Sequence, residues 1–432
     1  MRVGFATLDI TPEIGSDIPG GFSPRVSTGI RDPLQAQACV VEGDDDRLLA
    51  VVSVDAVWVP DATVAAARER ACAETELNER DICIAATHTH CGGPSHSVLG
   101  TDVNPTYSDL LAERISEAVV SALGQRVEAE LIEAADDCPD WAFNRRWVLP
   151  DGSHKTNPGK DNPEVLHPAG PVDPELRVLA FRDTQGTWLG AITNYTCHST
   201  VMWGSEFSAD YAGCWRNALA ERSGNAAFCM VFLNGACGDI NQFDFANPDV
   251  REAGPEWAKR MGAALADCTW KSMTCEEGNR KKALFCNSAH GEVTVPCRVP
   301  TPEQLAADQA LATSDEDWTS AKWQARDRLL LAERLGDATT SEQPIDVYRI
   351  GETLIAAAPW QPFCEYGLRL KADAGKPLMV ATFANGGCGY VPTPAGFEGG
   401  GYEPTLCRGS FLAPSAGDLM TGALLDLSRG LS

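Results

Sequence analysis

The stretch Ile82-Cys83-Ile84-Ala85-Ala86-Thr87-His88-Thr89-His90-Cys91-Gly92-Gly93-Pro94 decides the fold of this chain. Its five leading apolar residues are typical of a buried strand, and the glycines and proline at its end predict a turn. Histidines two apart on a strand point to the same face, so we expect His88 and His90 to lie side by side at a strand end. The chain has only 7 histidines, which favours a metal-binding or catalytic pair over two core histidines that bond to the backbone.

Apolar runs and helical periodicity alternate along the rest of the chain, which predicts an α/β protein with mixed β-sheets flanked by helices. Two runs separated by Gly351-Glu352 predict a hairpin, so the sheets are not purely parallel. The expected strands are 36–41, 48–54, 82–86, 176–181, 189–194, 228–233, 347–350, 354–358 and 378–383. The expected helices are 62–75, 105–122, 212–222, 255–268, 302–312, 318–335 and 417–428.

We expect residues 1–432 to form one domain, because no linker, repeat or low-complexity segment divides them. Residues 138–172 are rich in Pro, Gly, Asn and Asp, and predict a long loop or cap. Residues 302–340 predict a helical excursion. Its second helix is charged and amphipathic, which is typical of a solvated face or a subunit contact.

Charge and cysteine usage restrict the expected partners. The chain has 35 basic and 60 acidic residues, a net charge of −25, which disfavours nucleic acid and stable membrane association. No signal peptide or membrane-spanning run is visible, and the 16 cysteines form no Cys-x-x-Cys pair, so we expect a cytoplasmic protein with free thiols. The expected partner is a small-molecule substrate, and a homo-oligomer is compatible with this composition.

Two other segments place polar residues beside a strand end. His198 ends an apolar run and is a third candidate ligand next to the His-x-His pair. In the glycine turn after residue 233, Gly238 precedes Asp239 and Asn241. Such a turn can present backbone N–H groups to a ligand, as an oxyanion hole requires, or Asp239 can simply cap a helix.

Tyr390 and Tyr402 lie in a glycine-dense loop near the C-terminus. A phenol there can bind a metal, donate a hydrogen bond to a developing oxyanion, or fill space as an aromatic plug. The remaining histidines lack comparable surroundings and are interpreted as surface or loop residues: His96, His154, His167 and His290.

Taken together, these segments resemble the catalytic domain of the neutral (non-lysosomal) ceramidase family. The most specific motifs in the resemblance are Thr87-His88-Thr89-His90 and Gly389-Tyr390-Val391-Pro392-Thr393. Weaker motifs occur in the same order along nearly the whole chain: Asp9-Ile10-Thr11-Pro12, Ser53-Val54-Asp55, Phe143-Asn144-Arg145-Arg146, 194–202 and Asn234-Gly235-Ala236-Cys237-Gly238-Asp239. The resemblance implies the fold of that catalytic domain.

The resemblance also implies a zinc site with one zinc per chain. In the family, zinc is held by two histidines, a glutamate and a tyrosine, and by motif these positions include His88, His198 and Tyr390. Three further residues match family groups that position the substrate or polarise its carbonyl: His90, Arg145 and Tyr402.

Three features depart from the family pattern. Gln361 occupies the position of the ligating glutamate, and Glu365, one helical turn later, is the alternative carboxylate for the metal. Asn241 stands where the family has a serine linked to catalysis. The sequence ends soon after the catalytic segment, so we expect no C-terminal immunoglobulin-like domain of the kind that ceramidases carry.

These features predict a metal-dependent hydrolase, with zinc as the metal and an amide bond of a soluble polar substrate as the target. A glycan-processing enzyme on the same fold is a second hypothesis, in which Gln361 and Glu403 contact the sugar and carboxylates such as Asp239 perform acid–base chemistry. In either case Gly238 is expected to contact the substrate. A non-catalytic ligand-binding module is the third hypothesis.

Overall fold

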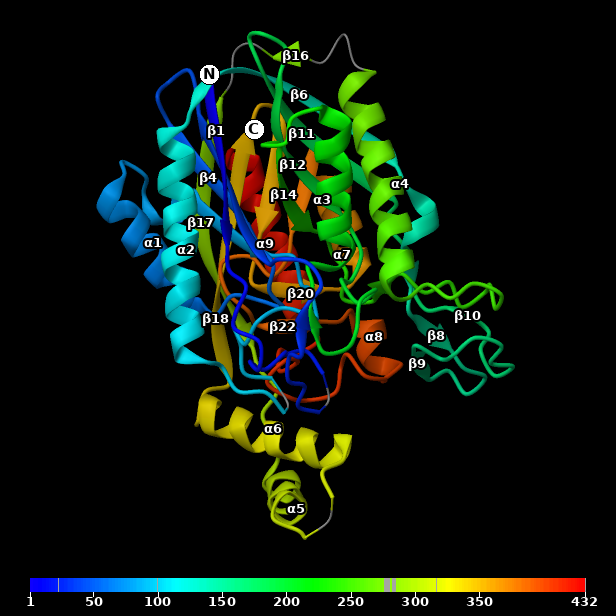
Figure 1. The fold of residues 1–432 in the computed structure, drawn as a ribbon. Helices are drawn as coiled ribbons and strands as arrows, with labels where there is room; N and C mark the ends of the chain where they lie inside the picture. The colour runs from blue at the N-terminus through cyan, green and yellow to red at the C-terminus, as the bar shows by residue number, and fades with distance from the viewer. Residues whose placement is uncertain (22, 99, 276–279, 282–284, 316, 432) are drawn as a thin grey trace.

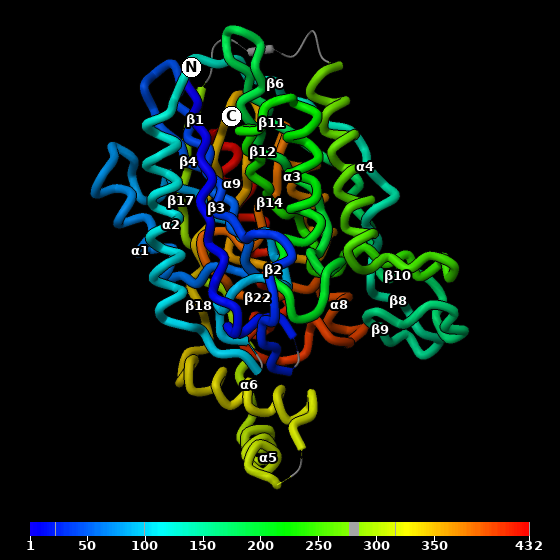
Figure 2. The backbone as a smooth tube through the Cα atoms, viewed as in Figure 1, coloured from blue at the N-terminus to red at the C-terminus, as the bar shows by residue number. Residues whose placement is uncertain are grey.

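The computed structural model describes residues 1–432 apart from 22, 99, 276–279, 282–284, 316 and 432. In this part of the chain two β-sheets pack against each other, and helices cover both outer faces (Figure 1; Figure 2). Both sheets contain parallel and antiparallel neighbours, which confirms the predicted α/β fold with mixed sheets.

The larger sheet has the strand order β14-β12-β11-β6-β1-β3-β4-β5, with β16 paired to β6. Strands β1 and β6 pair only through Arg2 and Val3, so the sheet divides into two halves at this point. Its strands are β1 (Arg2–Asp9), β3 (Gln35–Glu42), β4 (Leu48–Val54), β5 (Ile82–Ala86), β6 (Val127–Asp137), β11 (Glu175–Asp183), β12 (Trp188–Tyr195), β14 (Cys229–Asn234) and β16 (Arg280–Lys281).

The smaller sheet has the order β17-β18-β19-β21. Strands β18 and β19 form the predicted hairpin, and Gly351 makes its turn with a φ of 65°. The strands are β17 (Cys286–Pro296), β18 (Thr340–Ile350), β19 (Thr353–Ala357) and β21 (Leu378–Ala381).

Helices α2, α3 and α4 pack on the larger sheet, whereas α7 and α9 pack on the smaller one. Helix α2 begins after Asn104, whose side chain accepts hydrogen bonds from the Thr106 and Tyr107 amides, with Pro105 at its first position. The helices are α1 (Asp61–Glu74), α2 (Pro105–Gly124), α3 (Asp210–Ser223), α4 (Pro255–Thr274), α5 (Pro302–Ala312), α6 (Ser320–Leu335), α7 (Cys364–Asp373), α8 (Pro394–Glu398) and α9 (Ala416–Gly430), with 3₁₀ turns η1 (Glu79–Asp81) and η2 (Pro139–Trp141).

Alternation along the strands divides the core into layers. On β3, Val40 faces the helices of the larger sheet, whereas Val41 faces the smaller sheet and shares a cluster with Tyr348 and Ile355. On β18, Val347 faces the opposite way and packs against α7 and α9. Each fully buried side chain of this kind contributes about 1.5–3 kcal/mol to folding, so the strand register is strongly fixed.

All nine predicted strands and all seven predicted helices are present; most ends differ by a few residues, whereas β18 begins at Thr340 rather than 347 and α4 ends at Thr274 rather than 268. The sequence did not predict β1, β6, β17, α7 and α8. Strand β6 carries five acidic residues, which are poor strand formers, but its neighbours β1 and β11 bury Leu131 and Ile132 between the layers.

Two segments project from the layered body (Figure 1; Figure 2). Residues 138–172 contain the short strands β7 (Phe143–Asn144), β8 (Arg146–Val148), β9 (His154–Thr156) and β10 (His167–Pro168). Helices α5 and α6 form the second projection, between the paired strands β17 and β18. The remaining short strands are β2 (Gly29–Ile30), β13 (Glu206–Phe207), β15 (Ile240–Asn241), β20 (Trp360–Pro362) and β22 (Gly389–Val391).

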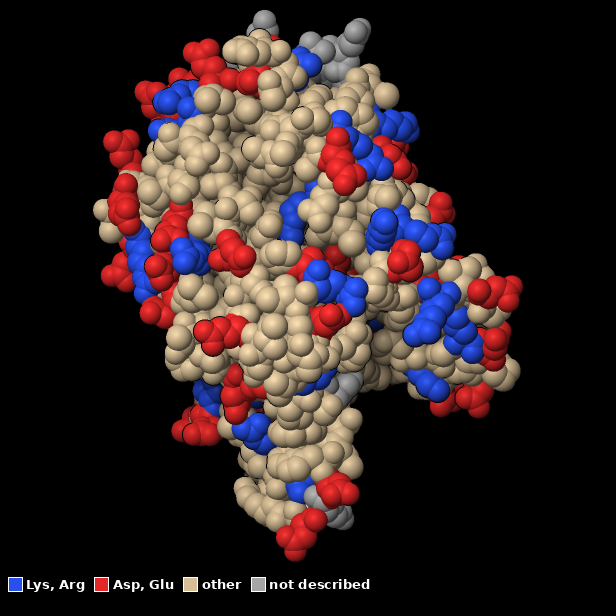
Figure 3. All heavy atoms as spheres, in the orientation of Figure 1, with Lys and Arg blue, Asp and Glu red and all other residues tan. Residues whose placement is uncertain are grey.

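Acidic and basic side chains are interspersed on the face shown in Figure 3. Among the helices that the structure describes, none is both long enough and apolar enough to cross a membrane.

His290 on β17 gives a pH-dependent contribution to stability. Its Nδ1 lies 2.9 Å from Asp346 Oδ1 and its Nε2 lies 3.5 Å from Asp81 Oδ1, and these carboxylates raise the pKa of His290 despite its partial burial and the nearby Arg80. The pKa of His290 is higher in the folded chain than in the unfolded chain, where it is about 6.5. The two ion pairs therefore stabilise the fold fully at a pH below the unfolded-state pKa, and this stabilisation is lost as the pH rises through the folded-state pKa.

We therefore expect His290→Gln to lower the free energy of unfolding by about 1 kcal/mol at pH 5.5, allowing for solvent screening, and by less at pH 8.5. Denaturant titrations at the two pH values measure the difference. His167→Gln, at an exposed histidine, serves as the control. An equal loss at both pH values for His290→Gln would contradict the electrostatic explanation.

Candidate metal centre

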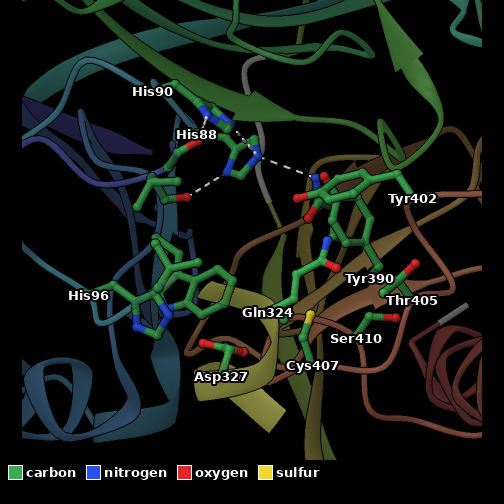
Figure 4. Close-up of a pocket in the computed structure, with 16 residues that line it drawn as sticks. His88, His90, His96, Gln324, Asp327, Tyr390, Tyr402, Thr405, Cys407 and Ser410 are labelled. Atoms are coloured by element: carbon green, nitrogen blue, oxygen red, sulfur yellow. Dashed lines mark hydrogen bonds between the residues drawn. The ribbon is translucent and has the colours of Figure 1, made fainter. Parts of the chain in front are cut away.

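The imidazole rings of His88, His90 and His198 meet at one point in the interior. Their Nε2 atoms lie 3.0 Å apart between His88 and His198, 3.2 Å between His90 and His198, and 3.3 Å between His88 and His90. His88 and His198 are buried. The structure thus brings together the three histidines that the sequence singled out, and Figure 4 shows two of them, His88 and His90, side by side.

The two histidines of the His-x-His pair converge for a reason other than strand alternation. Strand β5 ends at Ala86, and His88 adopts a left-handed φ of 65°, which is unfavourable for a residue with a Cβ. Backbone bonds on both sides hold this conformation: the Thr87 amide donates to Val54 O and the His90 amide donates to Ser199 O. Our expectation that they lie side by side is confirmed, but the strand geometry behind it is wrong.

A backbone carbonyl fixes each ring from behind. Nδ1 lies 2.6 Å from Val57 O in His88, 2.9 Å from Gly20 O in His90 and 3.2 Å from Cys237 O in His198. With Nδ1–H donating to these carbonyls, all three Nε2 lone pairs point at the same space.

Burial is the main reason why all three rings stay neutral. It lowers the pKa of His88 and of His198 well below the ordinary value, and it lowers the pKa of His90 to about 3, with Arg25 and Arg145 adding to the effect on His90. Neutral imidazoles are the form that binds metal ions.

This donor set fits zinc. Nitrogens bound tetrahedrally to one zinc at about 2.0–2.1 Å lie about 3.3 Å apart, which agrees with the observed spacing. Three neutral rings whose lone pairs face one another repel unless a cation lies between them. His90, which was expected to face the substrate, therefore belongs to the nitrogen cluster.

Gln361 and Tyr390 reach the histidines from the parallel strand pair β20–β22, where they are direct partners in the register. The Gln361 Nε2 atom lies 3.3 Å from His88 Nε2 and 3.4 Å from His198 Nδ1. Gln361 thus occupies a place beside the histidines where a ligating carboxylate would be stronger, because an uncharged amide is a weak metal ligand.

Arg145 connects Tyr390 to the protein interior. Its Nη2 donates to the Tyr390 hydroxyl at 3.0 Å and to Gly238 O at 2.8 Å, and its Nε donates to Glu403 Oε1 at 3.0 Å. Burial alone would lower the pKa of Arg145, but Tyr390 and Glu403 raise it, so the guanidinium stays charged. Burial raises the pKa of Tyr390, and the phenol therefore stays protonated.

The glycine turn 234–241 packs beneath strand β20, next to the site. The Gly238 amide donates to Pro362 O, and a Cβ on this glycine would lie 2.7 Å from Gln361 O, so the residue is needed for close packing under β20. The Gly238 carbonyl also accepts from Arg145 Nη2, so both polar backbone atoms take part in hydrogen bonds within the protein, and the substrate contact stays a prediction. Asn241 faces the outer cavity, and its amide bonds to Asn157 Oδ1 at 2.8 Å.

The carboxylates expected near the substrate lie elsewhere. Glu403 is fully buried, and it accepts hydrogen bonds from Arg145, Arg146 and Thr156. Asp239 accepts from the Cys364 amide at 2.7 Å and from Asn144, and burial raises its pKa to about 6.

Glu365 is exposed on α7 and lines a separate small cavity, so the structure does not bring it to the histidines. The Cys364 amide, at the first position of α7, donates to Asp239 Oδ1, so the carboxylate at the start of this helix is Asp239.

Two cavities meet at the histidines. The outer cavity, of about 410 Å³, is lined by His90, His198, Trp203, Tyr390 and Tyr402, among others. The inner cavity, of about 70 Å³, extends from His88 and Gln361 to helix α6. Tyr390 and Tyr402 line both, with their rings in edge-to-face contact at 5.7 Å between centroids.

Several residues of the inner cavity were missed in the sequence. His96 lies in a loop, in agreement with its interpretation as a surface or loop residue, but its ring also packs on Trp58 at 3.7 Å between centroids and lines the cavity. Helix α6 contributes Gln324 and Asp327, although its sequence is typical of a solvated face. No local pattern marks these residues, because the cavity brings together side chains of α6, of the loop after β5 and of the β20–β22 pair, which are far apart in the sequence.

Comparisons with known proteins agree with this architecture. The neutral ceramidase of Pseudomonas aeruginosa is 27% identical over 279 residues, which are 59% of this chain but only 40% of the relative's length. The crystal structure of neutral ceramidase from Pseudomonas aeruginosa superposes on the whole chain with a TM-score of 0.78 at 18% identity, and 74% of that structure is covered. A structure described as ceramidase complexed with C2 gives a TM-score of 0.75, also at 18% identity, with 75% covered.

The family profile described as "Neutral/alkaline non-lysosomal ceramidase, N-terminal" matches residues 1–318, well over half of the chain. This match agrees with the order of the motifs, the fold and the position of the histidine cluster. The chain therefore belongs to the neutral/alkaline non-lysosomal ceramidase family.

Proposed function

We propose that this chain is a zinc-dependent hydrolase that cleaves an amide bond in a small, polar, soluble substrate. The observation that carries the proposal is the convergence of three neutral imidazole nitrogens within 3.3 Å of one another at the junction of two cavities. His88, His90 and His198 would hold one zinc per chain. When bound, zinc supplies Lewis acidity to a carbonyl oxygen and to water.

Tyr390 is suited to stabilise negative charge that develops on the carbonyl oxygen. Its hydroxyl accepts a hydrogen bond from Arg145 at 3.0 Å, so its own proton is left to donate to a substrate oxygen. Arg145 is a positioning residue in this arrangement, because Glu403 and Gly238 O hold its guanidinium in place. Tyr402, which lines both cavities beside Tyr390, would contact the substrate.

The small volume of the inner cavity supports a short substrate group at this end rather than a long alkyl chain. A cavity of about 70 Å³ has space for about five water-sized groups. Relatives of this chain are named ceramidases, and ceramide is an amide. Our proposal keeps this bond type, but the acyl and amine parts of the substrate are smaller than those of ceramide. The net charge of −25 supports a protein without nucleic-acid or membrane partners.

The glycan-processing alternative has less support. Glycoside hydrolysis uses two carboxyl groups that face the sugar. Among the described residues that line the two cavities, Asp327 is the only acid, and Arg408 occupies both of its oxygens. The carboxyl groups of Asp239 and Glu403 do not line either cavity.

The test combines metal content with a substrate series. We expect elemental analysis of protein expressed with ample zinc to find about one zinc per chain. We expect a chelator to abolish turnover of short N-acyl amides, and added zinc to restore it. Long-chain ceramide in detergent should react about tenfold more slowly or worse in kcat/KM than the best short amide. Metal-free wild-type protein, or a preference for long-chain ceramide, would refute the proposal.

A further inference from the structure

Two polar side chains at the end of the inner cavity have no hydrogen-bond partner among the described residues. Gln324 of α6 and His96 both line it, and neither forms a hydrogen bond with any residue that the structure describes. Figure 4 shows Gln324 extending from α6 toward Tyr390, with His96 on the opposite wall. Together they offer donor and acceptor atoms that a bound molecule can satisfy.

Charge at this end of the cavity is balanced. Asp327 accepts hydrogen bonds from the backbone amide of Arg408 at 2.7 Å and from its Nε at 2.8 Å, and Arg408 Nη2 lies 2.6 Å from the same carboxylate. Burial, with smaller effects of Arg408 and Arg334, lowers the pKa of His96 well below its ordinary value, so the ring is neutral. A charged ligand group would find no free counter-charge among the described residues that line this cavity.

The cavity is continuous with the reacting centre, because His88, His90, Gln361 and Tyr390 form its other end. A substrate group bound there would therefore lie next to a bond held at the histidines. The volume of about 70 Å³ limits this group to a few heavy atoms.

We propose that the inner cavity recognises a short, uncharged, hydroxyl-bearing group on one side of the scissile amide, through hydrogen bonds to Gln324 and His96. The inference rests on the proposed amide hydrolysis for the position of the bond, and it adds the substrate class. A wholly apolar group of the same size would form no hydrogen bond with Gln324 or His96, whereas a hydroxyl-bearing group offers these side chains a donor and an acceptor.

Ligand-observed NMR on the purified zinc-loaded protein tests this directly with two isosteric pairs. N-methylglycolamide and N-methylpropanamide differ by a hydroxyl in the acyl part, and N-(2-hydroxyethyl)acetamide and N-propylacetamide differ by a hydroxyl in the amine part. We expect the hydroxyl-bearing member of one pair to bind about five- to tenfold more tightly than its partner.

Gln324→Leu should remove this preference and leave the Kd of the apolar member nearly unchanged. His96→Phe, which can still pack on Trp58, is the second variant and should have the same effect. Gln309→Leu is the matched control, because it makes the same substitution at an exposed glutamine on the neighbouring helix α5, and the preference should persist. Thermal melts of each variant confirm that it is folded.

Equal binding within both pairs, or a preference that survives both Gln324→Leu and His96→Phe, would overturn the inference. The same NMR samples report hydrolysis over time, so the two proposals can fail separately. A hydroxyl preference without any amide turnover would refute the proposed function and leave this binding site. Amide turnover without a hydroxyl preference would refute this binding site and leave the proposed function.

Discussion

His198→Ala is expected to remove the bound zinc and to reduce kcat/KM for amide hydrolysis by about 10³-fold or more. The substitution deletes the nitrogen that lies 3.0 Å from His88 Nε2 and 3.2 Å from His90 Nε2, and it leaves two imidazoles where three converge. Elemental analysis and single-turnover kinetics measure the two effects, and His88→Ala should behave in the same way.

A thermal readout separates this metal role from a structural one. Zinc binds the folded state, so added zinc should raise the Tm of the wild-type protein by several degrees and leave the Tm of His198→Ala unchanged. His167→Ala, at an exposed histidine, is the control and should retain the zinc response. A variant that still binds one zinc per chain would exclude His198 as a ligand.

Gln361→Glu is expected to strengthen zinc binding by about 10- to 100-fold, which a competition titration with a chromogenic chelator measures. The side chain at this position lies 3.3 Å from His88 and 3.4 Å from His198, so a carboxylate there would add a negative charge next to the cation. Zinc affinity that stays the same would show that residue 361 lies outside the donor set.

The same substitution should shift stability in opposite directions with and without metal. In the metal-free protein a buried carboxylate is costly, so Gln361→Glu should lower the Tm, whereas with zinc it should raise the Tm above that of the wild type. Gln324→Glu places a carboxylate at the far end of the same cavity and provides the control, with little change in zinc affinity expected.

Long apolar runs made much of the fold predictable. Strands β4, β5 and β14 are buried on both faces, so their sequences are continuous apolar runs with one interpretation. Strands β1 and β17 were missed because only two residues of each are fully buried, and glycine and polar residues interrupt the apolar pattern. Their strand identity depends on partners far away in the sequence, such as the pairing of β1 with β3.

The candidate site was predictable where chemistry is concentrated in a motif. His88 and His198 were predicted to meet, and they do: each follows a strand of the larger sheet, and β14, the neighbour of β12, also contacts β4 and β5. Gln324 and His96 could not be predicted, since one lies on a helix with a charged surface pattern and the other in an irregular loop. Only the tertiary contact of α6 with the end of the inner cavity gives them a place in the site.

The projection formed by α5 and α6 has a consequence for how such a protein can change. Pro296 and Thr340 are paired neighbours on β17 and β18, so the intervening residues leave and re-enter the sheet at almost the same point. A segment anchored in this way can be lengthened, shortened or exchanged with little effect on strand pairing. Because the α5–α6 segment also forms the end of the inner cavity, changes in this segment would alter which substrates fit while the three histidines stay in place.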